Sequence, residues 1–153
     1  MTVVRAAARA TRRGAAANFT GEVFQDEVLV GQPPSRMRAT VVSFTPGART
    51  GWHAHPVGQT LYCLSGVGRI CIGKGSRPQA IYPGDTVMIP PNTMHWHGAA
   101  PDRLFAIWRC RKTASKAKAR IGPSTSATPN IQCNLRSTEQ VHGDLLNEPS
   151  AAW

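Results

Sequence analysis

The feature that most constrains the fold of this chain is a succession of short apolar runs, each ended by glycine or proline. Between residues 27 and 108 these runs are rich in β-branched and aromatic residues, and no segment keeps the 3.6-residue periodicity of an amphipathic helix. One strand and its turn occupy roughly ten residues, a spacing typical of β-sandwiches and barrels. The clearest expected strands are residues 39–45, 59–65, 67–72, 86–89 and 104–108. The sequence therefore predicts an all-β domain.

The length of 153 residues is enough for one domain and excludes two full ones. We expect a basic N-terminal arm over residues 1–20, the β-domain over residues 21–108 and a basic tail over residues 109–153. The tail has only six Leu, Ile or Val in 45 residues, too few to offset the entropy of ordering the chain. It is therefore expected to be irregular or disordered, with one short helix over residues 139–146. An altered reading frame, a fusion remnant or a lineage-specific extension would each explain its composition.

The formal net charge of +10 lies mostly in the two terminal segments. Residues 21–108 hold seven basic and five acidic groups, so the middle of the chain is nearly neutral, which argues against sequence-specific nucleic-acid binding. The four cysteines have no CxxC spacing, and we expect Cys63 and Cys71 to be buried free thiols. No apolar run approaches the roughly twenty residues of a membrane span, so we expect no membrane partner and a cytoplasmic location.

The most informative residues are four histidines in two closely spaced pairs, His53/His55 and His95/His97. On a β-strand, residues i and i+2 point to the same face of the sheet, so each pair can direct both imidazoles toward one interior. Neutral imidazole is a ligand of Mn, Fe, Co, Ni, Cu and Zn. Two such pairs in one all-β chain predict a transition-metal site, and the ligand type alone does not choose the metal.

The residues around these histidines resemble the two sequence motifs of the cupins. The spacing of the first motif is found in Gly47, His53, His55, Gln59 and Gly66, where Gln59 replaces the usual glutamate. The spacing of the second is found in Gly84, Pro90, Asn92 and His95, where Asn92 replaces a glycine; Ala99 replaces the terminal asparagine. The resemblance implies a single-domain double-stranded β-helix, or jelly-roll barrel, with a metal inside.

Three strings, GARTGWHAHPVGQTL, PPNTMHWHGAAP and NFTGEV, resemble the bacterial cupin-type hydroxynitrile lyases over residues 18–102. This resemblance implies an enzyme that uses manganese to cleave or form an aromatic (R)-cyanohydrin from hydrogen cyanide and an aldehyde. The metal ligands it implies are His53, His55, Gln59 and His95. It also places His97 in the cavity beside the metal, as the candidate general acid/base, and Thr50 on the cavity wall.

The glutamine at position 59 has a consequence that follows from charge alone. Three neutral histidines and a neutral amide leave a divalent ion its full +2 charge, whereas a glutamate ligand would leave +1. The ion is then a stronger Lewis acid for an alkoxide, cyanide or hydroxide. The resemblance favours Mn²⁺, and Fe²⁺, Ni²⁺, Zn²⁺ and Co²⁺ suit the same ligand types.

The chain departs from these lyases on the strand after the second motif. The lyases carry a histidine there and a glutamine slightly later, whereas residues 103–108 of this chain are RLFAIW. We expect Leu104 at the histidine position, which removes one proton carrier. The other candidates for the cavity wall are apolar or aromatic and either accept a hydrophobic substrate or fill the core: Val42, Tyr62, Met94, Phe105 and Trp108. Few charged groups are expected inside the barrel, which disfavours a sugar or keto-acid isomerase.

The sequence leaves three functions open. The first is cyanohydrin cleavage, and the second is a metal-dependent dioxygenase acting on a phenolic or enolic compound. The third is a non-catalytic barrel that binds a ligand, with its basic arms on an acidic partner. Because sheet edges commonly pair between subunits, we also expect a homodimer or higher homo-oligomer, with residues 19–29 as a candidate exchanged strand.

Overall fold

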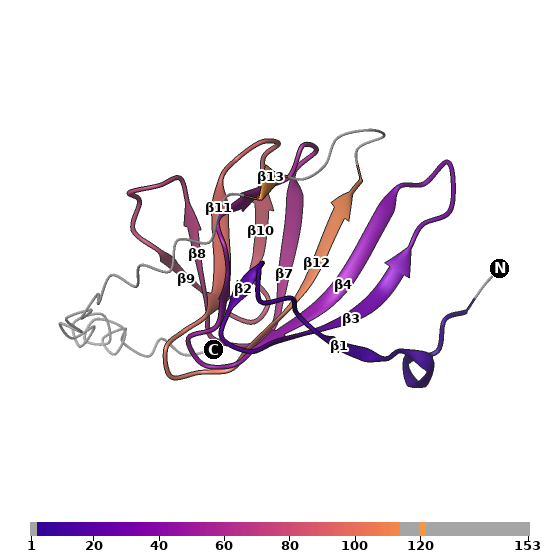
Figure 1. Cartoon of the computed structure of the whole chain (residues 1–153), viewed down its shortest axis with the longest axis horizontal. Coiled ribbons are helices and arrows are strands. Elements are labelled where there is room, and N and C mark those ends of the chain that lie inside the picture. The colour runs from indigo at the N-terminus through magenta and orange to yellow at the C-terminus, as the bar shows by residue number, and fades with distance from the viewer. Residues whose placement is uncertain (1–2, 114–119, 122–153) are drawn as a thin grey trace, which may run out of the picture.

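The computed structural model describes residues 3–113 and 120–121, and these form two antiparallel β-sheets that face one another (Figure 1). The first sheet, in spatial order, is β1 (Thr11–Arg13), β3 (Val23–Val30), β4 (Met37–Phe44), β12 (Phe105–Lys112), β7 (Gln59–Gly66) and β10 (Thr86–Ile89). The second is β13 (Arg120–Ile121), β6 (His53–Ala54), β11 (His95–Ala99), β5 (Arg49–Thr50) and β2 (Phe19–Thr20), with β8 (Gly68–Ile72) beside β11 and β9 (Gln79–Ile81) beside β8. A short 3-10 helix, η1 (Ala6–Ala8), precedes β1. The predicted all-β class is confirmed.

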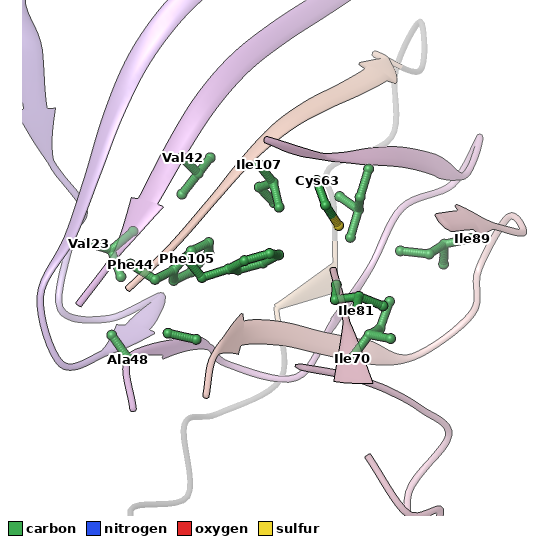
Figure 2. Close-up of a cluster of buried hydrophobic side chains, with 12 residues drawn as sticks. Val23, Val42, Phe44, Ala48, Cys63, Ile70, Ile81, Ile89, Phe105 and Ile107 are labelled. Carbon is green, nitrogen blue, oxygen red and sulfur yellow. The ribbon is translucent and has the colours of Figure 1, made fainter. Parts of the chain in front are cut away.

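The core lies between the two sheets and is built from alternate residues of each strand (Figure 2). Val42, Cys63 and Ile107 come from three neighbouring strands of the first sheet, and Ile70 and Ile81 come from the second. At the other end of this cluster the rings of Phe44 and Phe105 stack with centroids 6.1 Å apart. This alternation is what the period-2 pattern of a half-buried strand predicts.

Four of the five clearest expected strands lie within two residues of the observed ones, as β4, β7, β8 and β10. The expected strand 104–108 begins within one residue of β12 but ends too early, because β12 runs from Phe105 to Lys112. Its last four residues lie in the segment expected to be tail, and they pair in register with β4 as far as Lys112↔Met37. Pairing with β4 along all four residues, and with β7 as far as Cys110, stabilises this segment as strand, which composition alone does not indicate.

The N-terminal segment also contributes to the sheets. Thr11–Arg13 pairs with β3 as the edge strand β1, and Phe19–Thr20 pairs with β5. Within the single chain β3 is paired on both sides, with β1 and β4. An exchange of residues 19–29 between subunits stays a prediction.

Two further expectations concern the cysteines and the tail. Cys63 and Cys71 are buried free thiols, as predicted. The expected helix over residues 139–146 lies outside the described residues, and so does Cys133. In the described part of the chain, no helix has the length and apolar character needed to cross a membrane.

Candidate metal centre

The two histidine pairs converge because their strands are neighbours in the second sheet. His95 and His97 both lie on β11 and are completely buried, at 0% exposure, so the i, i+2 spacing directs both rings inward as predicted. Strand β11 pairs with β6 through His95↔His53. His55 follows β6 directly and is also buried. Local strand geometry therefore brings together four imidazoles from two distant parts of the sequence.

The rings form one compact group. The centroids of His53 and His95 are 4.2 Å apart, and that of His55 lies 5.1 Å from His53 and 5.9 Å from His95. Potential ligand nitrogens of His53, His95 and His97 all lie within 4.8 Å of one another. His97, which the sequence placed beside the metal, is thus close enough to His53 and His95 to share an ion with them. The ring centroids of His53, His55 and His95 lie at least as close together as those of His53, His95 and His97. The ligand set His53, His55, Gln59 and His95 stays a prediction.

Backbone carbonyls fix which nitrogen of two rings carries the proton. His53 Nδ1 lies 2.9 Å from the Gly51 carbonyl oxygen, and His95 Nδ1 lies 2.8 Å from that of Thr93. A carbonyl can only accept a hydrogen bond, so each Nδ1 donates and each Nε2 of the neutral ring keeps a free lone pair. Such carbonyl contacts are the usual supports of metal-bound histidines.

Gln59 meets one of these lone pairs. Its Oε1 lies 3.1 Å from His95 Nε2, so two acceptor atoms face each other in a buried site. Two acceptors repel, and the contact becomes favourable either when the amide turns so that Gln59 Nε2 donates to the ring or when a cation accepts both lone pairs. The pair is therefore compatible with a metal site.

Other polar atoms of the group fit the same interpretation. Both ring nitrogens of His55 and of His97, and Gln59 Nε2, are buried and have no hydrogen-bond partner among the described residues. A buried polar group left unpaired costs about 1–3 kcal/mol, so a set of them in one place is typical of a site that receives a ligand. These residues therefore fit a bound divalent cation.

The electrostatics keep the imidazoles neutral, which is the form that binds metal. Burial, followed by the charge of His95, lowers the pKa of His53 to about 4. Burial, followed by the charge of His53, lowers the pKa of His55 to about 3. Burial also holds the pKa of His97 well below its usual value. At neutral pH all three rings therefore offer a lone pair.

Thr50 supports His97 through the backbone. Its buried hydroxyl accepts a hydrogen bond from the backbone N–H of His97 at 3.1 Å, across the junction of β5 and β11. The next residue, Gly98, packs so closely that an added Cβ would overlap the Ala48 carbonyl oxygen. This hydrogen bond makes Thr50 a positioning residue for His97, and its place on the cavity wall stays a prediction.

Comparisons with known proteins agree with this geometry. The model of the Cupin domain matches residues 40–108. The (R)-mandelonitrile lyase of Granulicella tundricola is 42% identical over 101 residues, which cover 66% of this chain and 76% of that protein. The chain belongs to the cupin family.

Solved structures carry the same fold. A cupin-like protein from Thermotoga maritima matches with a TM-score of 0.68 and 35% identity, over 73% of this chain and 84% of that one. The polyketide cyclase RemF from Streptomyces resistomycificus matches with a TM-score of 0.67 over 79% of this chain and 84% of that one, but at 16% identity, which shows the fold alone.

The backbone explains why asparagine can replace the usual glycine of the cupin motif at position 92. The φ of Asn92 is 58°, in the left-handed region that asparagine tolerates.

The cupin barrel corrects several expectations about the cavity wall. Leu104 does not take an inward position: it precedes β12 and is 66% exposed. Tyr62 is 43% exposed on the outer face of β7, and Trp108 pairs with it there, so both expectations were wrong. Val42 and Phe105 are each only 1% exposed and lie in the core cluster, which is the second role the sequence left open. Met94 is half-buried in the turn before β11.

Sequence analysis missed two residues inside the cupin barrel, Arg109 and Arg111. They follow Phe105 and Ile107 at intervals of two along β12, and therefore share their inward face. Their charges are among the smaller causes that lower the pKa of His53 and His55, after burial and the neighbouring histidine. The period-2 pattern that begins with Phe105 is the signal that could have found them.

Proposed function

We propose that this cupin is a metal-dependent enzyme that reversibly cleaves an aromatic cyanohydrin into an aldehyde and hydrogen cyanide. The observation that carries the proposal is the 42% identity to an (R)-mandelonitrile lyase over three quarters (76%) of that protein. The buried histidine cluster supports it, since it provides the neutral donor atoms that such a metal site needs.

The metal would be held by lone pairs that the fold already directs inward. We propose His53, His55, His95 and Gln59 as its ligands and Mn²⁺ as the ion. A divalent ion bound there supplies a positive charge that stabilises alkoxide and cyanide. Because none of the four proposed ligands is an anion, the site keeps that charge undiminished.

His97 is proposed to move the proton. It is buried, and its depressed pKa keeps it in the basic form at neutral pH. In cleavage, its ring nitrogen accepts the proton of the substrate hydroxyl. The carbon–carbon bond to the nitrile then breaks, and its electron pair leaves with the cyanide as the carbonyl double bond forms. The protonated His97 returns its proton to cyanide, and hydrogen cyanide and aldehyde are released.

Hydrogen bonding and packing hold His97 in place for this role. Thr50 anchors its backbone, and its ring lies edge-on to Phe44 with centroids 5.7 Å apart. On one side the ring therefore faces apolar core, and on the other it faces the remaining histidines. This arrangement excludes water on the core side and leaves proton exchange to the side where substrate would bind.

The test combines metal analysis with turnover. Full-length protein purified without chelator is analysed for bound metal, then reloaded with Mn²⁺ or Fe²⁺ and assayed for (R)-mandelonitrile cleavage with and without oxygen. We expect one equivalent of metal and cleavage that does not need oxygen. His53→Ala should lose both metal and cleavage, whereas the matched control His142→Ala, outside both motifs, should keep them.

The other outcomes discriminate the alternatives. Bound metal without cleavage would contradict the lyase proposal and redirect the search to dioxygenase substrates, for which turnover requires oxygen. Protein that binds no metal under any loading condition would contradict every metal-dependent function and leave a ligand-binding barrel.

A further inference from the structure

The inner face of β12 carries two positive side chains, Arg109 and Arg111, that the proposed reaction does not use. We propose that Arg109 and Arg111 form an anion-binding subsite, and that the small molecule taken by this cupin carries a carboxylate. The inference rests on the proposed function only in taking the histidine cluster as the reactive centre.

The register of β12 fixes where Arg109 lies. This strand runs between β4 and β7 (Figure 1), and Arg109 pairs with Thr40 on one side and Leu61 on the other. Leu61 is fully buried on the inner face of its strand, so Arg109 is directed to the same interior. Gln59 lies two residues from Leu61 on that face, a diagonal neighbour at about 7–8 Å, which a long side chain can span.

The charge of this pair is not balanced within the described part of the chain. The ion pairs found there join Arg13 to Glu22, Arg38 to Glu27, and Arg103 to Asp102, so none includes Arg109 or Arg111. Arg109 Nε is buried and has no hydrogen-bond partner among the described residues. Taking a cation out of water without an anion is costly, and a bound anion would offset that cost.

The same imbalance is visible in the pKa of the arginine. Burial, followed by the charges of Arg111 and Arg38, lowers the pKa of Arg109 to about 10. It remains a cation at neutral pH, so the group stays charged in surroundings that disfavour charge. Arg111 pairs with Arg38 across β12 and β4, which places three guanidinium groups at one end of this sheet.

The chemistry of the neighbours favours a carboxylate. A guanidinium is a planar fork that binds the two oxygens of a carboxylate together, whereas cyanide offers only one atom at each end. The residues next to Arg109 on the inner face, Leu61 and Ile107, are apolar and suit a hydrocarbon or aromatic body. At the same end, a surface pocket of about 350 Å³ is lined in part by Arg36 and Arg38. A small organic carboxylate therefore suits the Arg109 guanidinium and its apolar neighbours.

The test compares benzoate with its neutral isostere benzamide by titration calorimetry, in metal-free and Mn²⁺-loaded full-length protein. A charge-assisted pair should make benzoate bind roughly ten- to hundredfold tighter than benzamide in both forms. Arg109→Gln should abolish this preference, and Arg109→Lys, which keeps the charge without the fork, should keep only part of it. Arg103→Gln, at an exposed arginine, is the matched control and should leave both affinities unchanged.

Folding of the variants is checked by urea denaturation. Because Arg109→Gln removes a charge unpaired among the described residues, it should not lower the free energy of unfolding. Equal binding of benzoate and benzamide, or a benzoate preference that survives in Arg109→Gln, would overturn the subsite. If Arg109→Gln fails to fold, Arg109→Lys and Arg111→Gln decide by the same comparison.

The two proposals fail separately. Protein that binds benzoate through Arg109 but does not cleave mandelonitrile keeps the anion subsite and loses the lyase. Protein that cleaves mandelonitrile without an arginine-dependent preference for benzoate keeps the lyase and loses the subsite.

Discussion

The two halves of strand β12 differ in what their inner faces carry. The inner face begins with Phe105 and Ile107, which are at most 1% exposed and belong to the apolar core. The same face continues with Arg109 and Arg111. The apolar end has no side-chain polar atom to pair, whereas Arg109 Nε at the polar end is buried without a hydrogen-bond partner in the described part of the chain. Buried polar groups without partners lower the stability of the folded chain, so they are expected where a bound ligand pairs with them.

The largest effect is expected from breaking the apolar end. Phe105→Ala removes a ring that stacks on Phe44 and leaves a cavity, and should lower the free energy of unfolding by about 3–5 kcal/mol. The neighbouring Leu104→Ala is a matched control at an exposed position, where we expect a change of less than about 0.5 kcal/mol. Urea denaturation measures both. Similar losses in the two variants would contradict the assignment of Phe105 to the core and Leu104 to the surface.

Metal bound by the histidine cluster should stabilise the folded protein. Free Mn²⁺ at a hundred times its dissociation constant should raise the free energy of unfolding by about 2.7 kcal/mol over the value in chelator. His95→Ala should remove this increment, since His95 is central to the cluster. Thermal unfolding with and without chelator is the measurement. An increment that survives in His95→Ala would place the metal elsewhere.

A smaller effect is expected where the two strands of the site are joined. Thr50→Val keeps the shape of the side chain but removes the hydroxyl that accepts the His97 N–H, and should cost about 1–3 kcal/mol. Thr50→Ser keeps the hydroxyl and should stay close to the wild type. If Thr50 acts by positioning His97, turnover in Thr50→Val should fall with little change in metal content. Equal stability of the valine and serine variants would contradict this role.

The most gradual effect is expected from pH, in metal-free protein. The pKa of His53 is about 4 and that of His55 about 3 in the folded chain, against 6.5 as the ordinary value. As pH falls from about 6.5 toward 4, the unfolded chain takes up protons that the folded chain does not. The free energy of unfolding should therefore fall over this range and be constant above pH 7. His55→Gln should make the fall shallower, and an unchanged stability between pH 7 and 5 would contradict the prediction.

The sequence predicted the parts of this site that depend on local order. The i, i+2 spacing of His95 and His97 is enough to place both rings on one face of a strand, wherever that strand lies. The central strands could be recognised because short β-branched runs bounded by glycine and proline are typical of β-strands. Strand β3, in contrast, mixes acidic and apolar residues in VFQDEVLV and has no such signal, so its pairing with β4 had to come from the tertiary structure.

The prediction from sequence was wrong where a shift of one residue along a strand moves a side chain to the opposite face of the sheet. Leu104 was placed inside by aligning its strand with a family pattern, and the observed strand starts one residue later, so that Phe105 points inward and Leu104 outward. The same alternation carries Arg109 into the barrel, although composition had assigned it to a solvated tail. Each side chain of a strand points to one face of the sheet or the other, and cross-strand pairing decides which face that is.

By itself, then, the sequence determined an all-β domain with the motifs of the cupins and a set of candidate metal ligands, because strand periodicity and imidazole chemistry are local properties. The tertiary structure decided the rest. It grouped His97 with His53 and His95, turned Tyr62 and Leu104 outward, and directed Arg109 to the inner face of β12. These outcomes depend on the register between strands far apart in the chain, which is fixed by packing of the whole barrel.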